Sequence, residues 1–244
     1  MTELGRRLAR ARPVGGAHFN LAGQQANTLL HDGHAWKDFS RTALAGIRRA
    51  LRTDAPMLVH ASFAFVRVMP PADPLRSLAE AILECEALAL TGRMPACVVR
   101  LGYLYGPGSA DLRAYRTAFR LGRPYWAGPA AARQDHLHVE DAVAALLAAA
   151  RRNNAGRTFY ATDGHPLPFM QFMDHFARKV GRRRPLHAPL ISKPLMKLVV
   201  REEHMQQVAL GMPGRTPAPR VPGWKPRTAD FRAGLDAIVD GWDG

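Results

Sequence analysis

The sequence has few of the features that cross-link small proteins or anchor them in membranes. Its 244 residues include two cysteines, Cys85 and Cys97, too few for a disulfide framework or a cysteine metal site. We expect two buried free thiols. The longest apolar run covers the nine residues from Ala142 to Ala150, whereas a bilayer-spanning helix needs about 20. No apolar leader follows Met1, so we expect a cytoplasmic location.

Acidic residues are also scarce, because 20 Asp and Glu face 34 Lys and Arg, for a net charge of +14. This excess is compatible with acidic partners such as nucleic acid, anionic lipid or phosphorylated ligands. We do not favour nucleic acid, since Arg- and Ala-rich compositions also arise without it. Apolar residues make up 47% of the chain, which permits a sizeable core and excludes a disordered chain.

Short apolar strands alternate with amphipathic helices along the chain. We expect helices in the first residues and over Trp36–Thr53, Asp73–Gly92, Glu140–Gly156 and Phe169–Gly181. The expected strands lie within Gly16–Gly23, Pro56–Val66, Ala96–Leu101, Gln134–Val139 and Arg157–Thr162. This alternation predicts an α/β fold with a parallel sheet covered on both faces.

The composition changes near Gly181. Residues 181–228 contain ten Lys and Arg, two acids and eight prolines, so they carry +8 of the net charge. We interpret residues 1–180 as a Rossmann-like domain and residues 181–244 as a small basic C-terminal lobe that resembles a substrate lobe.

A glycine-rich phosphate loop is missing. The strand Ala96–Leu101 runs into the turn "YGPG", Tyr105–Gly108, as strands of nucleotide-binding sheets often do. A GxxGxxG turn between a strand and a long helix should precede it, but Gly15–Gly16 and the glycines at 102, 106 and 108 have the wrong spacing.

The motifs "LVHASFAFV", "ACVVRLGYLYGPG", "DHLHVEDAVAALL" and "GRTFYATDG" occur in the order found in the extended short-chain dehydrogenase/reductases. The chain resembles this NAD-dependent epimerase/dehydratase family over residues 16–240. "GWKPRTADFRAGLDAIVDGW" is similar to the family's closing segment, and the stretch from Ala161 to Pro185 is similar to its hydroxysteroid-type branch.

The resemblance implies a Rossmann-like fold that is N-terminally truncated. "GAHFNLAG" resembles the family's fourth strand, and the three strands that precede it in the family, with their phosphate loop, have no counterpart. NAD or NADP is the implied cofactor. The implied cofactor-binding residues are Ala22, Gly23, Ser62, Gly102 and Tyr105.

The family's catalytic residues are absent. Its Ser or Thr position holds Phe63, and its Tyr-x-x-x-Lys pair aligns with Pro74 and Leu78. In the family the tyrosine exchanges a proton with a substrate oxygen, and the lysine lowers the tyrosine pKa. Ser62 and Tyr103 are therefore the candidate catalytic residues that are left.

We expect no metal site. His136 and His138 alternate on one face of a strand, but no third ligand has suitable spacing. The resemblance implies that His138 belongs to an "HVxD" segment and that Asp141 caps the following helix. The run Arg182–Arg184 is interpreted as a solvated face after a helix end.

Three functions stay open. The chain is expected to be an epimerase/dehydratase-like or hydroxysteroid-dehydrogenase-like protein that has lost ordinary catalysis. The alternatives are a non-catalytic scaffold for a small ligand or protein, and a module that binds RNA or an anionic surface. A homodimer is also expected, because family members often pair through helices equivalent to Trp36–Thr53 and Leu75–Leu90, and because the strand Ala17–Ala22 would be a sheet edge.

The missing phosphate loop predicts weak or undetectable binding of NAD(H) and NADP(H) to the purified chain. Calorimetric titration with each nucleotide tests this. A dissociation constant in the low micromolar range, about 8 kcal/mol of binding free energy, would contradict the prediction.

Overall fold

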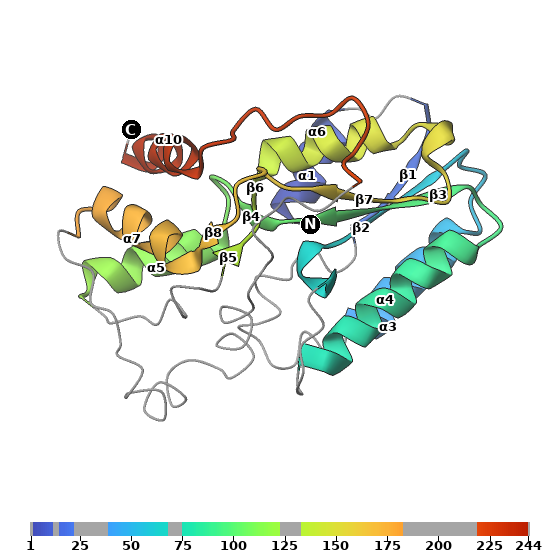
Figure 1. Ribbon diagram of the computed structural model, residues 1–244, viewed down its shortest axis with the longest axis horizontal. Helices are drawn as coiled ribbons and strands as arrows, with labels where there is room; N and C mark the ends of the chain where they lie inside the picture. Colours follow the sequence, from blue (N-terminus) through green and yellow to red (C-terminus); the bar gives the residue numbers. More distant parts are fainter. Residues whose placement is uncertain are drawn as a thin grey trace.

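The computed structural model describes residues 2–11, 15–21, 39–67, 75–122, 133–182 and 219–243 (Figure 1). Its centre is a four-stranded sheet in which every neighbouring pair is parallel. The strand order is β1 (His18–Asn20), β2 (Leu58–Phe63), β3 (Ala96–Leu101) and β7 (Thr158–Ala161). The expected α/β fold with a parallel Rossmann-like sheet is confirmed.

The register places the ends of the two central strands at one edge. Leu58 pairs with Ala96 at the start of the ladder, and Phe63 pairs with Leu101 at its end. The loop after Phe63, which begins with the short helix η1 (Ala64–Arg67), and the chain leaving β3 therefore start at the same carboxyl edge. This is the arrangement that the motif order predicts.

Helices cover both faces of the sheet (Figure 1). α3 (Phe39–Ala50) and α4 (Leu75–Thr91) lie on one face, where Ile47, Leu58 and Ile82 belong to one buried cluster. α1 (Glu3–Arg10) and α6 (Val139–Ala149) lie on the other.

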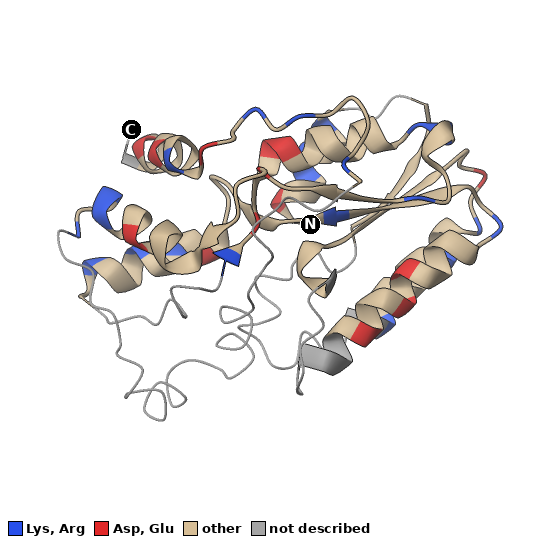
Figure 2. Ribbon diagram, in the orientation of Figure 1, with Lys and Arg blue, Asp and Glu red and all other residues tan. Residues whose placement is uncertain are grey.

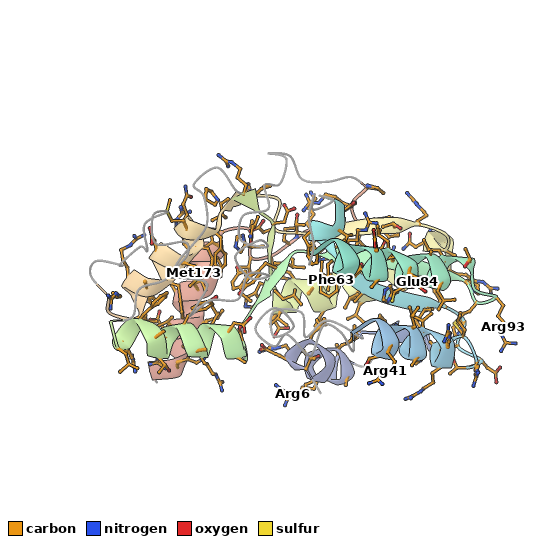
Figure 3. The ribbon with its side chains drawn as sticks, turned by 90° about the horizontal axis from the view of Figure 1, so that it is seen from below. Arg6, Arg41, Phe63, Glu84, Arg93 and Met173 are labelled. Carbon is orange, nitrogen blue, oxygen red and sulfur yellow. The ribbon has the colours of Figure 1, made fainter. Side chains whose placement is uncertain are left out.

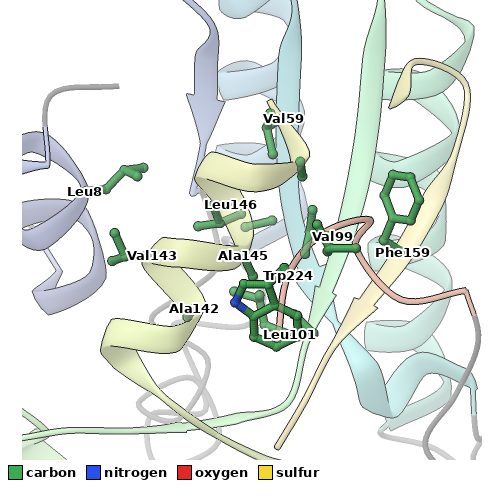
Figure 4. Packing of buried hydrophobic residues seen from close by; sticks show 14 of the residues in the cluster. Leu8, Val59, Val99, Leu101, Ala142, Val143, Ala145, Leu146, Phe159 and Trp224 are labelled. Carbon is green, nitrogen blue, oxygen red and sulfur yellow. The ribbon is translucent and has the colours of Figure 1, made fainter. Parts of the chain in front are cut away.

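The cluster on the α1 and α6 side contains the alternate side chains of the strands (Figure 4). Val59, Val99 and Phe159 come from three strands, and Leu8 and Leu146 come from the two helices. Burial of each such side chain stabilises the fold by about 1.5–3 kcal/mol before the entropic cost. The strands are buried on both faces, as a parallel sheet requires.

A second group of elements lies at the carboxyl end of the sheet. Its cluster of buried aromatic and aliphatic side chains joins three helices, α5 (Ala110–Arg120), α7 (Phe169–Lys179) and α10 (Phe231–Asp243). Two short ladders connect it to the sheet: β4 (Tyr103–Tyr105) pairs in parallel with β6 (His136–His138), and β5 (Arg133–Gln134) pairs antiparallel with β8 (Leu167–Pro168). The remaining element is the short helix η2 (Arg152–Asn154).

The sequence predictions did not include α5 or α10. A signal for α5 was present, because Ser109 precedes it and its hydroxyl accepts a hydrogen bond from the backbone N–H of Leu112. At its other end, Arg182 donates to the carbonyl oxygens of Phe119 and Gly122. Arg182 thus holds the end of α5. The boundary at residues 180–181 stays a prediction, and residues 183–218 lie outside the described residues.

Cys85 and Cys97 are free and buried, as expected. Burial raises the pKa of each thiol to about 12, which keeps both protonated. Among the described residues, no helix is long and apolar enough to cross a membrane.

Asp141 has a different role from the one expected. The cap of α6 is His138, whose Nδ1 accepts from the backbone N–H of Glu140. The Asp141 carboxylate instead accepts from the backbone N–H groups of Arg227 and Thr228, at 2.8 and 2.9 Å. The capping prediction was wrong because these two donors, 86 and 87 residues away in sequence, take both oxygens.

Replacing Asp141 with Ala should detach the segment that leads into α10. The backbone N–H groups of Arg227 and Thr228 would lose their charged acceptor in a buried site, since Asp141 is 1% exposed. We therefore expect the free energy of unfolding to fall by about 2–4 kcal/mol. Urea denaturation of the variant measures this. The control is Glu140→Ala, because Glu140 pairs with Arg7 at the surface and its loss should cost less than about 1 kcal/mol. Equal losses in the two variants would contradict the clamp.

Candidate functional site

The candidate site is the carboxyl edge of the sheet, where the ends of β2, β3 and β7 meet the second group of helices. In open parallel sheets, ligands bind at this edge. Gly102 is the first residue after β3, and its N–H donates to the carbonyl oxygen of Ala161 at 3.0 Å. A Cβ at residue 102 would lie 3.0 Å from the carbonyl oxygen of Asp135. Close backbone packing is thus sufficient reason for this glycine, and its contact with a cofactor stays a prediction.

Tyr103 lies within an aromatic cluster. Its ring makes edge contacts with His136, Phe169 and Phe172 at centroid distances of 5.7–5.9 Å. Burial, with a smaller contribution from Asp111, holds the pKa of Tyr103 well above its usual value. The phenol therefore stays protonated near neutral pH.

Tyr105 is buried more deeply, with 1% of its surface exposed. Its hydroxyl has no hydrogen-bond partner among the described residues. A Cβ at Gly234 would lie 2.7 Å from that oxygen, so α10 packs directly against it. Burial raises the Tyr105 pKa. In this structure the side chain joins α10 to the carboxyl edge.

Ser62 points away from the crevice, into a buried ionic network under α4. Its hydroxyl donates to the Glu86 carboxylate at 2.5 Å. Arg100 from β3 donates to the same carboxylate through Nε at 2.9 Å and Nη2 at 2.6 Å, and its Nη1 donates to the Tyr160 hydroxyl at 2.6 Å. A catalytic or cofactor-binding role for Ser62 would require this network to open.

The network extends toward β1. His60 is 1% exposed, and its Nδ1 lies 3.4 Å from the side-chain nitrogen of Asn20. Burial lowers the His60 pKa to about 4, although Glu86 opposes this effect. The imidazole is therefore neutral at physiological pH. Together these side chains form a polar layer between the sheet and α4.

The position of the family's catalytic Ser or Thr holds an apolar side chain. Phe63 is 8% exposed and belongs to the α3–α4 cluster. Its ring centroid lies 5.6 Å from that of Phe65. Ala22, Gly23 and Pro74 lie outside the described residues, so their predicted roles are not placed.

The described residues contain no group of three His, Cys, Asp or Glu that could hold a metal. His136 stacks on Phe172 at 4.6 Å, and burial lowers its pKa to about 3. His138 lies against Tyr105 at 5.3 Å and caps α6. In the described residues, His136 therefore packs in the aromatic cluster and His138 caps a helix.

Two buried acids were not among the site residues predicted from the sequence. Asp135 lies between β5 and β6, and Asp163 follows β7; they are 3% and 2% exposed. The pKa of Asp163 is raised to about 7, chiefly by burial and to a smaller extent by the nearby Asp135, while the hydrogen bond from the His165 N–H and the charge of Arg220 oppose the shift. A carboxyl group with this pKa can donate or accept a proton near neutrality. The available signal was an acid shortly after each of two short strands, one residue after Gln134 and two residues after Ala161.

Asp163 shapes the loop that forms one wall of a cleft. Its Oδ1 accepts from the backbone N–H of His165 at 2.9 Å. The cleft measures about 370 Å³ and lies between this loop, α7 and the start of α10. Its wall is half apolar and half polar: Pro166, Leu167, Ala229 and Phe231 alternate with His165, Gln171, Asp230 and Arg232. It is large enough for a small organic ligand.

The carboxyl edge fits only part of a nicotinamide dinucleotide. Among the described residues, Gly164 is a glycine with positive φ that lies just after a strand of the four-stranded sheet, where a phosphate-binding turn would be expected. Its N–H donates to the Thr162 hydroxyl, and β8 follows instead of a helix. The described residues therefore supply no glycine-rich turn against a helix N-terminus for the pyrophosphate. They supply the edge that the family uses for nicotinamide and substrate.

Comparison with known proteins gives three kinds of match. Residues 77–161 match the model of the NAD dependent epimerase/dehydratase family. A Streptomyces protein named 3-diazoavenalumate denitrifying reductase is 32% identical over 187 residues, which are 76% of this chain. The chain spans 58% of that relative's length.

Solved structures share the fold at low identity. A human epimerase family protein solved with NADPH superposes with a TM-score of 0.72 at 18% identity, covering 97% of this chain and 86% of its own. The UDP-glucose 4-epimerase of Thermotoga maritima, solved with UDP-glucose, gives 0.66 at 17% identity, covering 98% and 80%. The resemblance read from the sequence is confirmed by the epimerase/dehydratase family model over residues 77–161, by the 32% identical reductase and by the fold that the chain shares with solved epimerases.

Proposed function

We propose that the chain is a reductase-type member of this family that works without the Tyr–Lys pair. The observation that carries the proposal is the match of three quarters of the chain to a protein named as a reductase. The helix α4, where the family places the pair, contains neither Tyr nor Lys. Ordinary reduction of a carbonyl, which needs a proton for the oxygen, is expected to be lost.

A diazo substrate removes the need for that proton donor. The relative's name specifies reduction of a diazo compound with loss of nitrogen. An arenediazonium group already carries a positive charge, and hydride plus the diazonium ion yields the arene and dinitrogen. No oxygen becomes an anion, so no tyrosine has to protonate one. A bound nicotinamide cofactor would supply the hydride.

The cleft beside α7 supports a substrate with an apolar body and an acidic group. Leu167 and Phe231 offer apolar contact, and Gln171 offers an amide. The Arg232 guanidinium lies 4.6 Å from the centroid of the Phe231 ring and 3.6 Å from Asp230. Because that ion pair is long and exposed, Arg232 can turn to a carboxylate at little cost.

An arenediazonium carboxylate such as diazotised 4-aminocinnamate tests the proposal. With millimolar NADPH or NADH, the chain should release dinitrogen and oxidise the nicotinamide in equal amounts, faster than a mixture without protein. Absorbance at the nicotinamide band and gas analysis measure the two products. A steroid ketone should not be reduced, because the proton donor is missing.

The cleft is tested by Arg232→Gln, which should raise KM about tenfold, or 1.4 kcal/mol, and leave kcat within about twofold. The matched control is Arg178→Gln on the exposed face of α7, which should change neither constant. A rate no higher than the protein-free background would overturn the reductase proposal. An unchanged KM in Arg232→Gln would remove only the cleft from it.

We also propose that the chain forms a homodimer through α3 and α4. Arg48 and Arg49 on α3 are exposed, and Glu80 and Glu84 on α4 are exposed. Figure 2 shows acidic segments along α4, and Figure 3 shows Glu84 on α4 with α3 beside it. In a two-fold dimer in which α3 of each protomer faces α4 of the other, the arginines of α3 can meet the glutamates of α4 at two equivalent places.

Sedimentation of the chain at micromolar concentration should give a dimer. Glu80→Arg with Glu84→Arg should yield monomers, because like charges would then face each other. Adding Arg48→Glu and Arg49→Glu should restore the dimer. A monomer in the unaltered chain would contradict the proposed dimer. A dimer indifferent to these charges would contradict this interface and direct attention to the outer strand β1, where Phe19 and the following Leu21 are half-buried.

A further inference from the structure

A second cleft shares no lining residue with the one beside α7. It measures about 360 Å³ and lies between α1, the turn Pro107–Gly108, α5 and the end of α10. Its arginines come from two separate elements, Arg6, Arg7 and Arg10 from α1 and Arg113 from α5. In Figure 3 the labelled Arg6 extends from α1 away from the body of the molecule.

The base of this cleft is fixed from two sides. The Glu3 carboxylate accepts from the backbone N–H of Gly108 at 2.9 Å. The Trp242 indole donates to the carbonyl oxygen of Pro107 at 3.0 Å. A Cβ at residue 108 would lie 2.6 Å from the Glu3 carboxyl carbon, so a side chain there would displace the Glu3 carboxylate from this N–H. The arginines therefore surround a turn whose position is set by residues far apart in sequence.

The charge in the cleft is strongly one-sided. Glu3 is the acid that lines it, and that carboxylate accepts from Arg7 Nε at 2.9 Å. Arg7 also pairs with Glu140 on α6. Arg6, Arg10 and Arg113 add three exposed guanidinium groups, and a further arginine, Arg116, lies 5.4 Å from the Trp242 ring centroid. Positive charge gathered in a concave surface concentrates anions there.

We propose that this cleft binds the diphosphate group of a small ligand. Guanidinium groups pair with phosphate oxygens in a bidentate manner, and arginines from α1 and α5 can engage two successive phosphates. The backbone N–H of Gly108 is taken by Glu3, so binding rests on side chains alone.

Calorimetric titration of the 244-residue chain with inorganic pyrophosphate, at low ionic strength, tests the proposal. Binding should be at least tenfold tighter than that of orthophosphate, because two phosphates contact more arginines. Arg10→Gln with Arg113→Gln should weaken pyrophosphate binding about tenfold or more. Both side chains are exposed, so the double variant should keep its circular dichroism spectrum and unfolding midpoint.

The control removes the same charge elsewhere, with Arg151→Gln and Arg152→Gln, two exposed residues at the short helix η2. It should leave the pyrophosphate affinity within about twofold, apart from the general effect of net charge. Equal weakening in the two double variants would reduce the effect to overall charge and overturn the site. Absence of pyrophosphate binding would overturn it as well. Neither result bears on the reductase proposal, whose assay uses other residues.

Discussion

The close passage of the backbone at Gly102 sets the geometry of the carboxyl edge. There the chain leaves β3, donates to the Ala161 carbonyl, and continues at Tyr103 with a hydrogen bond to the Asp135 carbonyl. Asp163 in turn donates from its backbone N–H to the His136 carbonyl. These hydrogen bonds connect the four-stranded sheet to the two-stranded ladder of β4 and β6. A side chain at residue 102 would clash with the backbone of Asp135 and His136 and push β4 away from β6. Tyr105 lies on β4 and packs against α10, so this contact would also be disturbed.

The polar layer beneath α4 gives a physical account of Ser62. A buried carboxylate is costly unless its oxygens receive several hydrogen bonds. Glu86 receives them from Ser62 and from the guanidinium of Arg100. Arg100 then uses its remaining group on Tyr160. Removing any one member leaves the others with unmet charge or hydrogen-bonding groups, so the layer acts as a unit.

This layer also affects which side chains near the crevice are available for catalysis. Family chemistry needs a hydroxyl and a phenol facing the nicotinamide. Here the hydroxyl is committed to Glu86, the neighbouring position is Phe63, and Tyr103 lies among aromatic rings. The buried acid with a pKa of about 7 is Asp163, which follows the outer strand β7. A reaction that needs hydride but no proton from the protein is consistent with such a site.

Much of the fold was predictable because its signals are local. Apolar runs marked β2 and β3, and the spacing of apolar residues marked α4 and α7. The short ladders were harder, since strands such as Leu167–Pro168 are two residues long and exist only through their partner β5. Asp141 illustrates the same limit at the level of one residue. Its position near a helix start predicted a cap, but its partners are 86 and 87 residues away.

The turn "YGPG" shows how a motif can persist while its local chemistry changes. From the sequence it indicated the turn that follows a strand of a nucleotide-binding sheet. In the structure the N–H of Gly108 is bound by Glu3, a residue 105 positions earlier, and the carbonyl of Pro107 is bound by Trp242. The turn now serves to bring α1 and α10 together. Because α1 carries Arg6, Arg7 and Arg10, holding its first turn against residue 108 gathers those charges beside Arg113. Anion recognition here would therefore depend on side chains that a backbone contact has positioned.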